Sequence, residues 1–263
     1  MIFIIVDSRY MLWGILMKDN EIMDGWEILD LALFMRKENT LIISDLQLGY
    51  EEMMQKKGVL MPRFNFREIH DRLERIFTGL SAGGIVKLDR IIVNGDFKHE
   101  FGKILEQEWG EVIDTITLLQ KHCNELVLVK GNHDITLGPI AKWKEVSFMD
   151  FFLLDGGKTI VLHGDSTDYK ELKKASNIVI GHEHPAITIR EAVKAETFKC
   201  FLKGKWKGKT IVVLPSMNSV SIGSDVTKNE PLSPFLKAGV DEFEAWVVGD
   251  RPYYFGKVKG ISE

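Results

Sequence analysis

Cysteine is scarce in this chain. The 263 residues include two cysteines, Cys123 and Cys200, and they form no CxxC pair. This spacing argues against a zinc knuckle and against a disulfide framework. Two buried thiols are the state expected in a reducing compartment, so we predict a cytoplasmic protein.

Long apolar runs are also missing. No run reaches the roughly 20 apolar residues that a membrane-spanning helix needs, so we expect no membrane partner. Residues 1–17 are apolar, but Asp7 and Arg9 interrupt them, and no basic leader precedes them. A small-residue cleavage site is lacking as well, and we therefore do not expect a signal peptide.

Charge of one sign is not in large excess. The 34 Lys and Arg residues and 38 Asp and Glu residues leave a net charge of −4. No global positive field would attract a polyanion, and a nucleic-acid substrate would need a local basic groove. The length and the 45% hydrophobic content suit one large globular domain, which we expect to span residues 1–263.

Five short apolar runs predict buried parallel strands. These runs are residues 41–43, 91–93, 126–129, 160–162 and 178–180. Segments 66–80 and 105–119 carry apolar residues at helical spacing and separate the first three runs. This alternation predicts a largely parallel sheet with right-handed crossovers.

The two ends of the chain have a different pattern. Residues 1–35 and 186–257 contain β-rich runs without helical periodicity, and we expect them to form a second, mixed sheet. Residues 221–239 are polar, which predicts a long surface loop. Four lysines between residues 203 and 209 alternate with Gly and Trp. They fit either a solvated hairpin tip, which we favour, or a phosphate-gripping ribbon.

Polar residues follow each of the five apolar runs directly. They are Asp45 and Gln47, Asp96 and His99, Asn132 with His133 and Asp134, His163, and His182 with His184. Because parallel strands end at one edge of a sheet, we expect these side chains to converge. Carboxylates, an amide and imidazoles together suit Mn²⁺, Fe²⁺ or Zn²⁺.

The ligand set is too large for one tetrahedral ion. A pair of ions about 3.5–4 Å apart, bridged by a carboxylate, uses these side chains naturally. Such a pair can ionise a bridging water near neutral pH and clamp a phosphoryl oxygen. The residues therefore predict phosphoester hydrolysis through a dinuclear metal centre with a bridging hydroxide.

The order of these motifs resembles that of the calcineurin-like metallophosphoesterases. The family pattern is D-x-H, GD-x-x-H, GNH-D/E, a lone H and GH-x-H. Residues 41–185 follow this order, and four of the five motifs are complete. The resemblance implies an α/β fold, a four-layer αββα sandwich with two mixed β-sheets. It also implies two divalent metal ions, Mn²⁺ ahead of Fe²⁺, Zn²⁺ or Mg²⁺.

The resemblance also assigns roles. The implied metal ligands are Asp96 as the bridge, Asp45, Gln47 and His184 at the first ion, and Asn132, His163 and His182 at the second. His133 would protonate the leaving oxygen or stabilise transition-state charge. Asp134 would orient His133, and His99 would assist catalysis or orient the phosphate.

Gln47 departs from the family pattern, which has histidine at this position. A carboxamide oxygen can coordinate a metal but is a poorer ligand than imidazole for these ions. Gln47 could bind the first ion weakly, bind it through a water, or leave the first position partly vacant. We favour an occupied but weakened first position, because Asp45, Asp96 and His184 are all present.

A narrower resemblance adds a substrate class. Segments 58–62, 95–102 and 181–185 are similar to archaeal phosphoesterases related to the exonuclease SbcD and to ligase-associated DNA-repair phosphoesterases. This implies a phosphoester substrate such as DNA or a nucleotide. The alternative is a catalytically weakened protein-binding scaffold, since the fold has non-catalytic members such as the phosphoesterase-like subunit of retromer. The sequence makes no prediction about the oligomeric state.

Overall fold

The structure is a computed structural model that describes residues 20–60, 64–99, 106–191 and 194–261. The interpretation of residues 1–17, and the N-terminal part of the β-rich run predicted for residues 1–35, lie outside the described residues. None of the helices in the described part has the length and apolar content of a membrane-crossing segment.

The first sheet has seven strands in the order β1 to β7. They are β1 (Glu21–Met23), β2 (Trp26–Leu29), β3 (Ala32–Met35), β4 (Thr40–Ile43), β5 (Leu88–Asn94), β6 (Cys123–Val129) and β7 (Ser147–Met149). The first four strands pair antiparallel, and β4 to β7 pair parallel. The parallel strands read as continuous apolar runs because both of their faces are covered.

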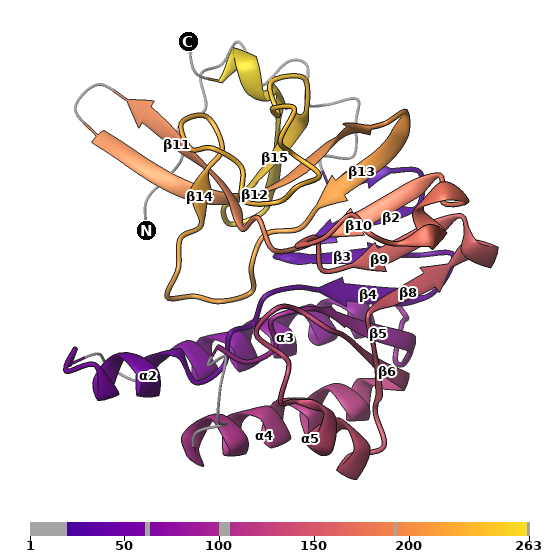
Figure 1. The fold of residues 1–263 in the computed structure, drawn as a ribbon, viewed down its shortest axis with the longest axis vertical. Coiled ribbons are helices and arrows are strands. Elements are labelled where there is room, and N and C mark those ends of the chain that lie inside the picture. Colours follow the sequence, from indigo (N-terminus) through magenta and orange to yellow (C-terminus); the bar gives the residue numbers. More distant parts are fainter. Residues whose placement is uncertain (1–19, 61–63, 100–105, 192–193, 262–263) are drawn as a thin grey trace.

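Helices cover the outer face of this sheet (Figure 1). They are α3 (Asn65–Ala82), α4 (Glu106–His122) and α5 (Gly138–Trp143), whereas α2 (Tyr50–Lys56) lies beyond the strand ends in this view. In α3 the buried apolar residues Ile69, Leu73, Ile76, Phe77 and Leu80 recur at helical spacing and pack on the sheet. The predicted helices at 66–80 and 105–119 are thereby confirmed, except for residue 105, which lies outside the described part.

The second sheet has nine strands. They are β8 (Phe151–Leu154), β9 (Thr159–Leu162), β10 (Asn177–Ile180), β11 (Pro185–Glu191), β12 (Lys194–Trp206), β13 (Lys209–Val213), β14 (Ser224–Asp225), β15 (Glu244–Val248) and β16 (Pro252–Lys257). Strand β10 pairs parallel with both β9 and β13, whereas β12 pairs antiparallel with β11, β13 and β15. The sheet is therefore mixed, as predicted.

Two expectations about sheet membership are wrong. The five apolar runs do not share one sheet, because β4, β5 and β6 lie in the first sheet and β9 and β10 lie in the second. Strands β1 to β3 join the first sheet, whereas we expected the N-terminal run in the second. Short turns connect β1 to β4 and make these strands neighbours, which the apolar pattern alone does not reveal.

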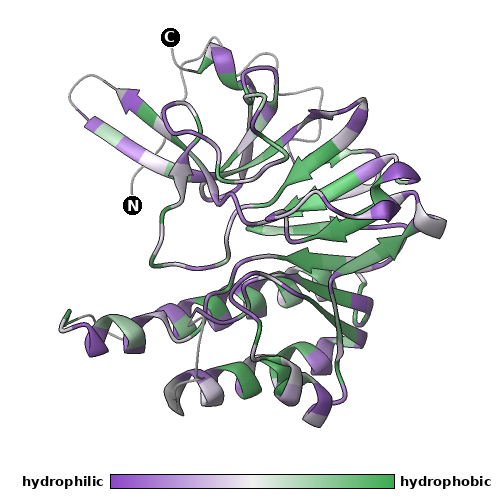
Figure 2. Ribbon diagram, in the orientation of Figure 1, coloured by the Kyte–Doolittle hydropathy of each residue, from purple (hydrophilic) through white to green (hydrophobic). Residues whose placement is uncertain are grey.

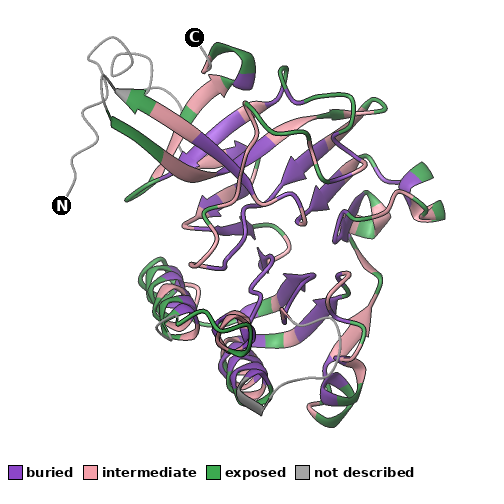
Figure 3. Cartoon of the chain, turned by 60° about the vertical axis from the view of Figure 1, so that its left-hand side comes forward, coloured by how far each residue is buried: buried purple, intermediate pink, exposed green. Residues whose placement is uncertain are grey.

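The two sheets share one hydrophobic core. Apolar side chains from both belong to a single cluster, including Ile42 and Ile92 from the first sheet and Val161, Val179 and Phe201 from the second. Figure 2 shows that the central strands of both layers are mainly hydrophobic, and Figure 3 shows that they are mainly buried, as β4, β9 and β10 are. The prediction of an α/β fold with two mixed sheets is confirmed.

The outer face of the second sheet is covered differently from that of the first. In the described part of the chain its cover includes segment 231–243 and the short 3-10 helices η2 (Lys170–Lys173) and η3 (Val258–Gly260). Another short 3-10 helix, η1 (Asp155–Gly157), connects β8 to β9. Ser233 is fully buried and Phe235 is 3% exposed, so the loop predicted at 221–239 lies only partly on the surface.

The lysine-rich segment forms the hairpin between β12 and β13, with Lys207 and Gly208 in the turn. Lys203 pairs with Glu244 at 2.7 Å, and Lys209 donates to the carbonyl oxygen of Ala175. The hairpin interpretation is confirmed, and these two cations are engaged within the chain.

Candidate metal centre

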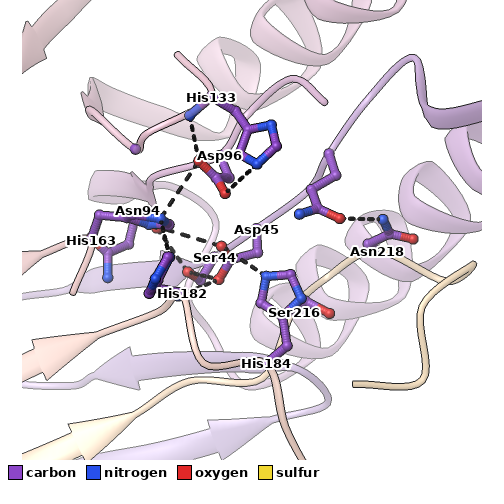
Figure 4. A network of polar contacts seen from close by, with 12 residues as sticks. Ser44, Asp45, Asn94, Asp96, His133, His163, His182, His184, Ser216 and Asn218 are labelled. Carbon is purple, nitrogen blue, oxygen red and sulfur yellow. Dashed lines mark hydrogen bonds and ion pairs between the residues drawn. The ribbon is translucent and has the colours of Figure 1, made fainter. Parts of the chain in front are cut away.

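The predicted ligands come from two sheets that face each other. Strands β4, β5 and β6 end at one edge of the first sheet, and β9 and β10 end at the facing edge of the second. Figure 4 shows the side chains that follow these strands gathered around Asp45 and Asp96. The expected convergence therefore occurs, although it takes place between two sheets rather than along one.

Several of these residues have a left-handed backbone. The φ angles of Asp45, Gln47, Asp96, His182 and His184 lie between 45° and 64°. This conformation costs an L-residue about 1 kcal/mol or more, and Asp and His are among the types that tolerate it best. It persists because the loops are bonded to one another: the Gln47 N–H donates to the Asp96 carbonyl at 2.9 Å, and the His182 N–H donates to Asp45 Oδ2 at 3.1 Å.

Two glycines let the loops approach each other. A Cβ atom at Gly131 would overlap the Asp96 carboxylate, and one at Gly181 would overlap the Ser44 hydroxyl. The motif glycines are therefore required by close backbone approach to the ligands.

One group of donor atoms surrounds His163. Ligand atoms of Asp96, His163 and His182 all lie within 4.8 Å of one another, which is the spacing of a metal-binding group. His163 Nε2 lies 3.1 Å from His182 Nδ1, 3.1 Å from Asn132 Oδ1 and 3.5 Å from Asp96 Oδ1. Imidazole nitrogens, a carboxylate oxygen and an amide oxygen that face one point suit a divalent transition metal.

A second group surrounds Asp45, whose side chain is fully buried. Its Oδ2 lies 2.6 Å from Ser44 Oγ and also accepts from the His182 N–H. Its Oδ1 is 3.1 Å from His184 Nε2 but makes no well-directed hydrogen bond to any described residue. A buried, under-bonded carboxylate oxygen beside an imidazole fits a cation ligand.

The electrostatics of the site also fit a cation. Burial raises the pKa of Asp96 to about 7, and the nearby carboxylates of Asp45 and Asp134 add to this shift. Burial acts the same way on Asp45, but the His184 and His163 imidazoles and the Ser44 hydroxyl outweigh it and hold its pKa at about 2. Burial, together with His163, lowers the pKa of His182 to about 4, which keeps this imidazole neutral and able to ligate.

His133 is oriented by the chain in a way the sequence did not reveal. Its Nδ1 is hydrogen-bonded to the carbonyl oxygen of His99, and its Nε2 lies 3.7 Å from Asp96 Oδ2. A carbonyl can only accept, so Nδ1 carries the proton in this bond. The His99 ring stacks on His133 at 5.4 Å and contacts the Tyr50 ring edge-on at 4.6 Å.

The orienting role of Asp134 toward His133 stays a prediction, and the structure adds contacts of Asp134 that the sequence did not reveal. Its buried carboxylate accepts from the backbone N–H groups of Phe97, Lys98 and Gly131 at 3.0–3.3 Å. These bonds join the loop after β5 to the loop after β6. Asp134 therefore holds the Asp96 and Asn132 loops together, a task that only the folded chain reveals.

Gln47 has a partner that the sequence analysis missed. Asn218 Nδ2 donates to Gln47 Oε1 at 2.9 Å, and Lys199 Nζ donates to the carbonyl oxygen of Ser216 at 2.8 Å. Asn218 and Ser216 follow β13, which runs parallel to β10 and ends at the same edge. The signal was present, since residues 211–214 are one more apolar run followed by polar residues.

Comparison of the chain with known proteins identifies one family. The family model described as calcineurin-like phosphoesterase matches residues 39–239. No curated protein is significantly similar to the chain. The Pseudomonas putida nuclease MPE is 16% identical, with a TM-score of 0.61 over 88% of this chain and 94% of that one.

A Vps29 from Entamoeba histolytica, solved with Zn²⁺, is 15% identical, with a TM-score of 0.37 over 82% of this chain and 98% of that one. At 16% identity the likeness to the nuclease MPE shows the fold alone. The family match covers most of the chain and contains all the predicted ligands. The chain therefore belongs to the calcineurin-like phosphoesterase family.

Proposed function

We propose that this protein hydrolyses phosphodiester bonds with two divalent metal ions, Mn²⁺ foremost. The observation that carries the proposal is the position of Asp96. Its carboxylate faces His163 and His182 in one donor group, and Asp45 with its partner His184 forms the other. We propose Asp96 as the bridge, Asn132, His163 and His182 at one ion, and Asp45 and His184 at the other.

The bound ions would supply Lewis acidity and an activated water. A side chain of the protein, His133, would supply the proton that the leaving oxygen needs. The His99 carbonyl fixes the Nδ1 proton of His133, and this leaves Nε2 to face the reacting group. We propose that His133, when protonated at both ring nitrogens, gives its Nε2 proton to the leaving oxygen and keeps its Nδ1 proton in the bond to the His99 carbonyl. We also propose that the adjacent His99 ring helps to orient the phosphate.

The proposed substrate class is a phosphodiester such as DNA or a nucleotide, as in the SbcD-related and ligase-associated phosphoesterases. The fold likeness to a nuclease is consistent with this class. We also propose that residues 1–263 form one domain, which the core shared by both sheets supports.

The test is hydrolysis of bis-p-nitrophenyl phosphate and of single- and double-stranded DNA with added Mn²⁺. We expect Asp96→Asn to reduce the rate at least about 10²-fold, because loss of a residue that merely supports a metal ligand already costs 10–100-fold. Asp89→Asn is the matched control, since Asp89 is an exposed carboxylate at the other end of the same strand, β5.

Equal rates in the natural protein and Asp96→Asn would contradict the proposal. A natural protein that binds Mn²⁺ but hydrolyses none of these substrates would favour the scaffold function instead. Hydrolysis of bis-p-nitrophenyl phosphate without cleavage of DNA would support a small phosphodiester as the substrate.

A further inference from the structure

The side chain at the unusual ligand position is bonded to a residue 171 positions later in the chain. Asn218 Nδ2 donates to Gln47 Oε1 at 2.9 Å, and the bond is buried. Asn218 is fully buried and Gln47 is 8% exposed. Figure 4 shows the bond at Asn218, beside the metal centre. Because this bond occupies the Gln47 oxygen, it determines which atom of the carboxamide is available for other contacts.

The orientation of Asn218 is fixed by the backbone. Its Oδ1 accepts hydrogen bonds from the N–H groups of Val220 at 2.7 Å and Ser221 at 3.3 Å. A backbone N–H can only donate, so the atom that faces these groups must be the carboxamide oxygen. The amino group of Asn218 therefore faces Gln47, and the Gln47 atom that receives it must be the oxygen.

The main chain of Asn218 is also fixed. Its N–H donates to the Asp45 carbonyl at 3.2 Å, and its own carbonyl accepts from Lys199 Nζ. Lys199 is bonded in addition to the Ser216 hydroxyl at 2.6 Å. Asn218 is thus held against the loop that carries Asp45.

We propose that Asn218 is a positioning residue that turns the Gln47 oxygen away from the metal ligands and leaves the Gln47 amino group as a donor for a phosphate oxygen of the substrate. This inference rests on the proposed function. In Figure 4 Asn218 stands apart from Asp96 and His163, so an oxygen that faces Asn218 faces away from them. Gln47 Nε2 has no hydrogen-bond partner among the described residues.

A glutamine held in this orientation offers the site a different chemical group from the histidine of the family pattern. A histidine at position 47 would offer a lone pair to a metal ion, whereas an amide N–H₂ group has only protons to offer. Phosphate oxygens accept such protons readily, and a hydrogen bond to a charged group is stronger than one between neutral groups. The ion at Asp45 and His184 would then keep fewer protein ligands and bind more weakly than the ion at His163 and His182.

The first experiment measures Mn²⁺ binding by calorimetry and then the binding of inorganic phosphate to the Mn²⁺-loaded protein. We expect Gln47→Ala to leave both Mn²⁺ dissociation constants within about twofold and to weaken phosphate binding about 10-fold, the effect of one charge-assisted hydrogen bond. If Gln47→Ala instead weakens the binding of one Mn²⁺ by about 10-fold or more, Gln47 is a metal ligand and the inference is wrong.

The second experiment is designed to turn the Gln47 carboxamide around by removing the Asn218 donor. In Asn218→Asp the residue still accepts from Val220 and Ser221 but can no longer donate to Gln47, so Gln47 should turn its oxygen toward the metal centre. We expect the weaker Mn²⁺ to bind about 10-fold more tightly. The same change in a Gln47→Ala background controls for the added negative charge, and the gain there should be smaller.

Equal gains in the two backgrounds would overturn the positioning role of Asn218. The Mn²⁺ measurements also distinguish failure of the proposed function from failure of this inference. If the natural protein bound no Mn²⁺, both the proposed function and this inference would be contradicted. Mn²⁺ binding that depends on the Gln47 side chain would remove the inference alone.

Discussion

At the residue scale, the candidate metal centre is surrounded by polar side chains that the fold buries fully or in part. Lys199 is a half-buried example outside the candidate ligands, and its ammonium group reaches from β12 to the chain after β13. Burial lowers the pKa of Lys199 to about 7, and the Arg72 guanidinium contributes to the shift. A lysine that loses its proton this easily makes folding stability depend on pH.

We predict that stability rises with pH between about 7 and the ordinary lysine pKa of 10.5. In this window the unfolded chain keeps the Lys199 proton and the folded chain releases it, so the folded state gains as pH rises. Urea unfolding at pH 7, 8 and 9 measures the slope. Lys199→Met should remove this contribution to the slope, while Lys205→Met, at an exposed position of the same strand, should keep it. Equal slopes in the two variants would contradict the prediction.

At the element scale, segment 231–243 takes the place of an outer helix. Glu183 lies between the proposed ligands His182 and His184 and accepts from the Ser233 N–H at 2.8 Å. The Ser233 hydroxyl donates to the Gly164 carbonyl at 2.6 Å. Both side chains are buried. The segment is therefore tied to the ends of β9 and β10, where His163 and His182 lie.

We predict that Glu183→Ala destabilises the protein by about 1–3 kcal/mol, because it leaves the buried Ser233 N–H without an acceptor. Hydrogen exchange should rise in segment 231–243. Glu183→Gln keeps an acceptor oxygen and serves as the control, with a smaller loss. If both variants lose the same stability in urea unfolding, the carboxylate charge matters rather than the hydrogen bond.

At the scale of the whole molecule, the candidate metal centre spans the two sheets. Asp45 and Asp96 come from the first sheet, and His163, His182 and His184 come from the second. An ion bound between them stabilises only the state in which both sheets are packed together. Metal binding is therefore linked to the stability of the entire fold.

We predict that Mn²⁺ at 100 times its dissociation constant stabilises the natural protein by about 2.7 kcal/mol. For a chain of this size the midpoint of thermal unfolding should rise by roughly 5–10 °C. Thermal scans with Mn²⁺ and with EDTA measure the shift. Asp96→Asn should lose most of it, and an equal shift in Asp89→Asn and Asp96→Asn would show that the ion binds elsewhere.

The sequence by itself determined the five apolar strands, the two long helices and the residue types at the candidate metal centre. Apolar runs are local patterns, and the residues that follow β4, β5, β6, β9 and β10 had to lie at strand ends. The family resemblance supplied their order and the two-sheet class, which the family match and the structure confirm.

The tertiary structure alone decided which strands share a sheet, since periodicity records burial but not the neighbour across a ladder. It also placed Asp134 against three backbone donors and Asn218 against Gln47. Hydrogen bonds between residues 171 positions apart form only after the sheets pack, and no local pattern encodes them.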